Sequence, residues 1–235
     1  MRASGRSSSR SRGSSMGVVA LSLAAAAGLA LLVATFTLPG GGTTQAQNVA
    51  FDSNSGCTAA TANGASWSTH DVGAGNNRLL LVGVSFRSEA DTQTVNTVTW
   101  DADGAGGNAP VALSVVAGTE QVNTVGTQTT DDVRVEIWRL LNPDSGTDGT
   151  IAIDLDGTGT SPISCGAASF SNVDQSTPFD AVGAPATSEG SSIASLTVAS
   201  SAGDVVFGVL ATQDGADTPL VGAGQTQYWN TFVDS

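Results

Sequence analysis

Residues 77–86 have the sequence NRLLLVGVSF, and this stretch decides the fold class. From Leu79 to Val84 it contains no polar side chain, so neither face of a strand would be left for solvent. Turn-forming residues bound the run, with Gly75 and Asn76 before it and Ser88 after it. A short apolar run between turn signals is typical of a strand with both faces buried. We therefore predict a buried strand over 77–86.

Other stretches alternate apolar and polar residues with the period of a strand. Residues 133–137 alternate strictly, which places Arg134 and Glu136 on one face. We predict a surface ion pair there, worth less than about 1 kcal/mol. An edge strand is predicted at 66–72. The strand at 133–137 is expected to continue to residue 141. The other predicted strands are 94–100, 111–116, 150–156, 163–170, 193–198, 204–211 and 225–232, with a long loop at 172–188.

No helical periodicity occurs after residue 46, and Thr, Val and Gly are abundant. Many short strands without intervening helices favour a sandwich or a barrel. We predict an all-β fold, an antiparallel β-sandwich of the jelly-roll type, preceded by an N-terminal signal or anchor helix. Because the chain stops at Ser235 without a closing turn, we also expect that a terminal strand is missing.

Residues 1–46 have the pattern of an export signal. Four arginines in the first 12 residues precede an uncharged apolar run over 16–38, and small residues follow up to Ala46. As a helix the run would be roughly 35 Å long, which is also enough to span a bilayer. Two alternatives remain: a signal cleaved near Ala46, which Pro39 and Gly40 favour, or an uncleaved anchor. In either case residues 47–235 lie outside the cytoplasm, secreted or at the cell surface, and only the N-terminal segment contacts a membrane.

The composition after Gln47 limits the partners of the predicted domain. Its 189 residues suit one domain with a substantial core. Four arginines stand against 21 acidic residues, which gives a formal charge of −17. Nucleic acid and anionic lipid surfaces would repel such a domain. Cys57 and Cys165 are the two cysteines, and an even count in an oxidising compartment predicts a disulfide between them, with two separate thiols as the alternative.

Several of these stretches resemble a class of secreted bacterial β-sandwich modules, which are jelly-roll, lectin-like and mostly of unassigned function. The resemblance covers roughly residues 70–210. It rests on residues 77–84, 136–138, 142–147 and 169–178. These motifs are strand and turn signatures, so the resemblance implies a fold and an exported, non-catalytic role. It carries over no catalytic residue.

Two acidic turns are candidate calcium sites. Asp101 and Asp103 precede Gly104, and Asp154 and Asp156 precede Gly157, so each turn offers two carboxylates to a hard cation. Both turns lack the remaining ligands of a full calcium loop. The alternative is a plain β-turn, in which Asp and Gly are favoured for backbone reasons. Calcium is therefore the one cofactor that the sequence suggests.

Aromatic side chains offer a second kind of binding surface, because an indole or phenol face can stack on a sugar ring. Trp100, Tyr228 and Trp229 are the candidates, and the adjacent pair near the C-terminus is expected to be exposed. Core packing is the alternative for each of them. A cell-surface glycan or protein is accordingly the expected partner.

Catalysis has little support in the sequence. His70 is the only histidine, no lysine occurs, and no Gly-x-Ser-x-Gly elbow marks a nucleophile. We expect His70 to be a polar residue at the start of an edge strand. The sequence thus predicts an extracellular, non-catalytic structural or adhesive module that is not an enzyme. A carbohydrate-binding module, with or without calcium, is the first alternative, and a secreted hydrolase is the second.

Overall fold

The computed structural model describes residues 21–22, 30–38, 48–58, 60–88, 93–104, 107–123, 132–157, 159–189, 193–212 and 220–230. These residues form antiparallel strands, turns and irregular segments, which confirms the all-β class. No helix occurs among them, and so none that could cross a membrane.

The largest sheet lies in the middle of the molecule and has the order β10-β11-β6-β13-β3, with β9 beside β11 and β4 beside β13. All pairings in it are antiparallel. Its strands are β3 (Ala50–Gly56), β4 (Ala60–Ala62), β6 (Leu79–Ser88), β9 (Ser114–Val115), β10 (Gln121–Asn123), β11 (Asp132–Leu141) and β13 (Ser161–Ser171).

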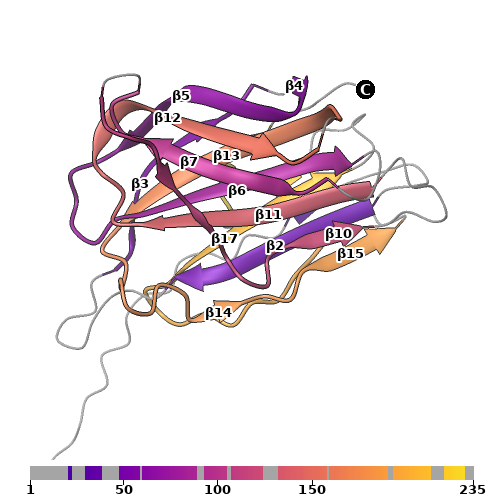
Figure 1. Ribbon diagram of the computed structural model, residues 1–235. Coiled ribbons are helices and arrows are strands. Elements are labelled where there is room, and N and C mark those ends of the chain that lie inside the picture. Colours follow the sequence, from indigo (N-terminus) through magenta and orange to yellow (C-terminus); the bar gives the residue numbers. More distant parts are fainter. Residues whose placement is uncertain are drawn as a thin grey trace, which may run out of the picture.

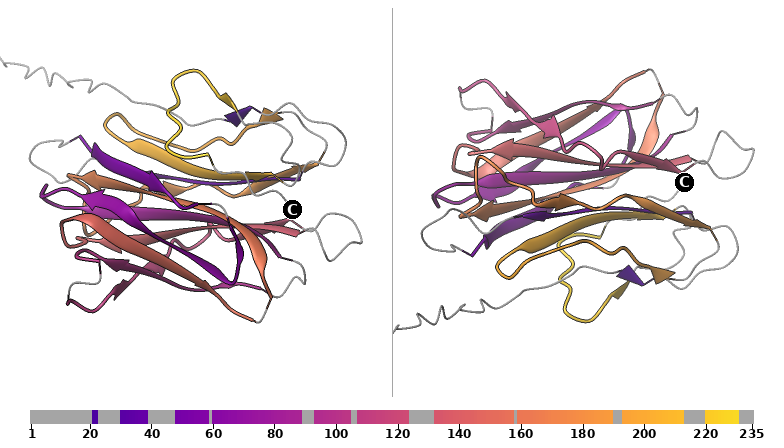
Figure 2. Two further views of the ribbon diagram at one scale, coloured as in Figure 1. Left: turned by 90° about the horizontal axis from the view of Figure 1, so that it is seen from above. Right: turned by 90° about the horizontal axis from the view of Figure 1, so that it is seen from below.

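Two further sheets cover the two faces of this middle sheet (Figure 1). The first cover has the order β5-β12-β7-β8, formed by Gly64–Val72, Gly146–Leu155, Val95–Asp101 and Val111–Ala112. The second cover has the order β14-β2-β15, with β17 also paired to β2; these strands are Ala181–Val182, Ala30–Leu38, Ala186–Glu189 and Val205–Thr212. A small sheet joins β1 (Leu21–Ser22), β16 (Ile193–Ala194) and β18 (Leu220–Val221). Figure 2 shows the yellow-orange second cover and the magenta first cover on opposite sides of the molecule.

The prediction of a strand buried on both faces is confirmed, because every residue from Leu79 to Phe86 is buried. Its side chains alternate between two separate cores. We call the cluster under the first cover the disulfide core; it contains Cys57, Trp67, Leu80, Val82, Val84, Trp100, Ile151, Ile153 and Cys165 among others. We call the cluster under the second cover the Trp229 core; it contains Leu79, Leu81, Val133, Val135, Ile137, Phe170, Phe207 and Val209, with Trp229 packed against it.

The predicted surface position of the Arg134–Glu136 pair is wrong. Strand β11 is an inner strand of the middle sheet, so the face that carries these residues is also covered. Glu136 is only 2% exposed. Its carboxylate accepts hydrogen bonds from Arg134 Nε at 2.6 Å and from Trp138 Nε1 at 2.9 Å. Burial raises the pKa of Glu136, and the Arg134 guanidinium partly offsets that effect.

The segments flanking the predicted strands differ from expectation in several places. The edge strand at 66–72 is confirmed as β5, the end of the first cover. Strand β3 was not predicted, since its sequence AFDSNSG has no apolar alternation. The loop at 172–188 contains β14 and most of β15. Residues 225–230 form no strand, although one was predicted there.

The N-terminal segment is the largest difference. Ala30–Leu38, part of the predicted signal or anchor helix, is strand β2 and pairs with β17, β14 and β15. A nine-residue apolar run that contains Val, Thr and Phe also suits a strand, and pairing with β17 supplies its backbone hydrogen bonds in water. Apart from residues 21–22 and 30–38, the predicted export segment lies outside the described residues.

Candidate functional site

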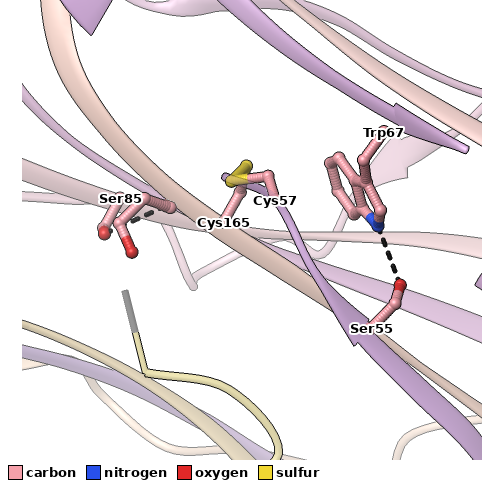
Figure 3. Close-up of a disulfide and its surroundings, with 6 residues drawn as sticks. Ser55, Cys57, Trp67, Ser85 and Cys165 are labelled. Carbon is pink, nitrogen blue, oxygen red and sulfur yellow. Dashed lines mark hydrogen bonds between the residues drawn. A yellow bond between two sulfur atoms is a disulfide. The ribbon is translucent and has the colours of Figure 1, made fainter. Parts of the chain in front are cut away.

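A disulfide links two neighbouring strands of the middle sheet, β3 and β13, at the edge that β3 forms. Cys57, directly after β3, is bonded to Cys165 of β13, with the two Cα atoms 5.3 Å apart. Both residues are buried, and the Cys57 amide also donates to the Cys165 carbonyl at 3.1 Å. Figure 3 shows the Trp67 indole beside the bridge, with its N–H directed at Ser55. The predicted disulfide is confirmed, and it ties an edge strand to an inner strand.

A polar cluster lies where β3 faces β5. A β-bulge in β3 leaves Asp52 without a register partner between Ser53 and Phe51. The Asp52 carboxylate accepts from the Gly73 amide at 2.6 Å and from Ser169 Oγ at 3.0 Å. Ser53 Oγ donates to the carbonyl of Asp71 and lies 3.0 Å from Ser169 Oγ. The bulge thus gathers hydroxyl and carboxylate groups from β3 and β13 beside backbone groups at the end of β5.

Ser55 and His70 form the one serine–histidine pair within the described residues that resembles catalytic machinery. Ser55 Oγ lies 2.9 Å from His70 Nδ1 and accepts the Trp67 indole N–H at 2.8 Å. His70 is fully buried, and its ring packs edge-on with Trp100, with centroids 5.8 Å apart. His70 lies in an edge strand, as expected, but it is near the end of β5 and its side chain is buried. Strand β5 is an edge strand, but one of its faces lies against the disulfide core.

The environment of His70 suits structure better than proton transfer. Burial lowers its pKa to about 4, although Asp71 and Asp52 act in the opposite direction. Its Nε2 atom is buried and has no hydrogen-bond partner among the described residues, so no carboxylate orients the ring as in a Ser-His-Asp triad. A general base works best with a pKa near the ambient pH. The Ser55–His70 pair therefore fits a structural role, as a buried hydrogen bond that links β3 to β5.

An aromatic stack lies at the outer edge of β3. The rings of Phe51 and Tyr228 are parallel within 8°, with centroids 4.6 Å apart. Phe51 is 44% exposed, and Tyr228 is half-buried, which raises the pKa of its phenol. Asn54 Nδ2 donates to the Tyr228 carbonyl at 2.7 Å and holds the C-terminal segment against β3. This is the described surface on which a flat apolar ligand face could stack.

The Trp229 indole packs on three glycines of the middle sheet, which we call the glycine seat. Gly56, Gly166 and Gly83 face one another across the neighbouring strands β3, β13 and β6. A Cβ atom on Gly166 would lie 2.1 Å from Trp229 Cδ2, and one on Gly83 would lie 3.0 Å from Cζ2. The glycines therefore leave room for the indole, which also packs against Phe207 at 5.7 Å. Trp229 is partly buried, in contrast to the exposed position predicted for it.

Trp100 lies deep in the disulfide core. It is 1% exposed, its Nε1 donates to the Asp144 carbonyl at 3.2 Å, and its ring lies against Gly149. Both ring faces are thus covered by protein, and a sugar could stack on it only after a rearrangement. Of the three aromatic residues predicted to bind a ligand, Tyr228 is the one beside an exposed ring.

The carboxylates of both acidic turns accept hydrogen bonds, from residues 94 and 96 in one turn and from nearby residues in the other. Asp156 accepts from the Thr94 amide at 2.5 Å and the Thr94 hydroxyl at 2.8 Å, and these bonds lower its pKa.

Asp154 accepts from Asn96 at 2.8 Å. Asp101 accepts from the Asp103 amide at 3.4 Å, and Asp103 accepts from Asn108 at 3.1 Å. Within the described ranges, no three His, Cys, Asp or Glu side chains are grouped to hold a metal. Calcium binding stays a prediction.

Sequence reasoning did not identify Phe51, Ser55 or the glycine seat. Phe51 is an isolated aromatic residue in a polar stretch, where no periodicity marks it. The mirrored dipeptides Gly56-Cys57 and Cys165-Gly166 were a usable signal, because a disulfide between them also brings the two glycines together. Comparisons with protein-family models, curated proteins and solved structures gave no match.

Proposed function

We propose that this chain is an exported, non-catalytic structural or adhesive module that acts outside the cell after its leader is removed near Ala46. The observation that carries the proposal is the buried Cys57–Cys165 disulfide. Such bonds persist in oxidising compartments and are rare in reducing ones. The basic and then apolar order of residues 1–46 supports the same compartment.

The use of the reactive side chains supports a non-catalytic role. His70 is fully buried beside Ser55, and Glu136 is held by Arg134 and Trp138. Of the groups that would do acid–base chemistry in a hydrolase, His70 links β5 to β3, and Glu136 is held by side chains of its own strand β11. If the hydrolase alternative were correct, turnover of a polysaccharide or an ester would be abolished by His70→Ala.

We also propose that the strands of this all-β fold are connected as in a jelly roll. The chain passes from β3 and β4 in the middle sheet to β5 in the first cover and back to β6. It then forms β7 and β8 in the first cover, β9, β10 and β11 in the middle sheet, β12 in the first cover and β13 in the middle sheet. Repeated crossing between two facing sheets is expected of Greek-key and jelly-roll connections.

Export and oxidation are tested together by expressing the full chain in a secreting bacterium. We expect protein in the medium that begins near Gln47, with no thiol open to alkylation until it is reduced. Intact mass and N-terminal sequencing measure both properties. Protein that begins at Met1 and stays in the cytoplasm with two reactive thiols would contradict the proposal.

Carbohydrate binding is the second candidate, and the Phe51–Tyr228 stack favours it, because it combines an exposed ring with a nearby amide on Asn54. On a glycan array, saturable binding should be lost in Phe51→Ala and in Tyr228→Ala. Val111→Ala is the matched control, since Val111 is also 44% exposed but lies on β8 of the first cover. Equal binding by all three variants would exclude this site.

Calcium assistance is tested on the same protein by isothermal titration. If the turns at Asp101 and Asp154 bind calcium, heat should be released and the melting temperature should rise. Asp103→Asn and Asp156→Asn should each reduce the effect. No heat and no shift in melting temperature would remove calcium from the proposal.

A further inference from the structure

The second cover is built around one strand. Within the described ranges, each of its pairings includes β2: residues 31–38 pair with 205–212 of β17, and the opposite edge of β2 pairs with β14 and β15. Strands β2 and β17 both lie against β11 of the middle sheet. Figure 1 shows β2 running beside β17 and β11, with β15 beyond it. Without β2, the second cover has no described ladder.

The same residues lie in the segment that export would remove. If the leader is cleaved near Ala46, β17 loses its described backbone partner along its whole length. Strand β11, whose Val133, Val135 and Ile137 belong to the Trp229 core, loses one of the two strands of the second cover that lie against it. An open strand edge beside uncovered apolar side chains is a template for another strand.

We propose that the processed module carries a strand-acceptor groove, bounded by β17 on one side and by β14 and β15 on the other. Its partner is an extended apolar segment of another polypeptide. The inference rests on the proposed removal of the leader. The groove binds by β-augmentation, in which backbone hydrogen bonds give affinity and alternate side chains give specificity.

The strand that fills the groove in this structure defines the chemistry of the partner. Residues 30–38, ALLVATFTL, are uncharged and include β-branched and aromatic residues. They run antiparallel to β17 with Ala34 opposite Val209. The partner is therefore an uncharged strand of eight or nine residues that runs antiparallel to β17. Charged segments are excluded, because the Trp229 core against which the groove opens is apolar and an unpaired charge beside it is costly.

The test uses exported protein whose N-terminus has been sequenced, and a labelled peptide with the sequence of residues 30–38 and terminal arginines for solubility. We expect saturable binding by fluorescence anisotropy, with slowed amide exchange at residues 205–212. The same peptide with Ala34→Pro lacks a central backbone donor and should bind about tenfold or more weakly. The full chain, whose own β2 fills the groove, should not bind either peptide.

Each other outcome overturns the inference. If exported protein begins near Gln47 and binds neither peptide, binds both equally, or already protects residues 205–212 without peptide, the groove is not an acceptor although processing occurs. A dimer that pairs through β17 would make a second copy the occupant instead. If exported protein begins at Met1, the proposed processing itself fails, and the groove is filled in cis.

Discussion

The two faces of the middle sheet are covered in different ways. The disulfide core is closed by β5, β7, β8 and β12, which all come from residues 64–155 and pair with one another. The Trp229 core is closed by the N-terminal β2, by strands after residue 180 and by the indole of Trp229. The first cover is therefore self-contained, whereas every described pairing of the second includes β2, the strand that the proposed processing would remove. We infer that the two halves differ in stability and that the second half is the one open to partners.

Loss of the disulfide should have the largest effect. Replacing Cys57 and Cys165 by Ala should lower the free energy of unfolding by about 4–5 kcal/mol, because the bridge closes a loop of more than 100 residues. Urea unfolding with and without reductant measures the change. Reductant should shift the wild-type protein and leave the double variant unchanged. An unshifted wild-type protein would mean that the bridge contributes nothing to the disulfide core.

Acid should weaken the disulfide core through His70. Because burial lowers its pKa from the ordinary 6.5 to about 4, the unfolded state binds a proton first as the pH falls. The contribution of His70 is complete above pH 6.5 and is lost as the pH falls through about 4, and its full size is about 3 kcal/mol. His70→Asn, which keeps a hydrogen-bonding group for Ser55, should flatten this part of the profile.

Glu136 also makes stability depend on pH, so its contribution has to be separated from that of His70. Its raised pKa gives the opposite slope, since that contribution is present at low pH and is lost as the pH rises through the raised value. Both proteins contain Glu136, so subtracting the stability–pH profile of His70→Asn from that of the wild type cancels the contribution of Glu136. Parallel profiles of the two proteins in urea unfolding would contradict the buried position of His70.

Two glycine substitutions compare the two cores directly. A Cβ on Gly149 would lie 2.0 Å from Trp100 Cη2, and one on Gly166 would lie 2.1 Å from Trp229 Cδ2. Trp100 is fully enclosed, so Gly149→Ala should cost about 2–3 kcal/mol through overpacking. Trp229 can move outward, so Gly166→Ala should cost only about 1 kcal/mol. Equal costs would contradict the difference between the covers.

A double-mutant cycle identifies the cause of the smaller cost. In a Trp229→Ala background the indole no longer opposes the new methyl group, so Gly166→Ala should become nearly neutral. Gly149→Ala should keep its full cost in that background, because it lies in the other core. Strict additivity of Gly166→Ala and Trp229→Ala would show that the two residues do not contact each other.

Phe51→Ala should have the smallest effect on stability. Phe51 is 44% exposed and stacks on a half-buried Tyr228, so its loss should cost about 1 kcal/mol or less. Phe170→Ala is the matched control, because Phe170 packs edge-on against Phe51 but is 1% exposed, and its loss should cost about 3–5 kcal/mol. Thermal melting separates the two. A large loss in Phe51→Ala would assign that ring to the core and not to a binding surface.

The sequence predicted the parts of the fold that local patterns determine. The run at Leu79–Val84 specified a strand buried on both faces, and the alternation at Val133–Ile137 specified β11. Two cysteines in a predicted oxidising compartment specified the disulfide. Each of these follows from side-chain chemistry within a few residues or from a simple count.

Features that depend on long-range contacts were not predicted. Alternation places Glu136 opposite the valines of its strand, but it does not show that a second sheet covers that face. Strand β3 is polar and owes its place to pairing with β13 and to the disulfide. The position of Trp229 depends on three glycines that are distant in sequence and aligned only by sheet register.

The central claim is that the second cover opens more easily than the first. Native-state hydrogen exchange on the full chain tests this most directly. We predict that amides of β6 and β12 exchange only through global unfolding, with free energies equal to that of the whole protein. Amides of β17 and β2 should exchange through a smaller opening that leaves the disulfide core intact. Equal protection of β17 and β12, lost together at one denaturant concentration, would contradict the account.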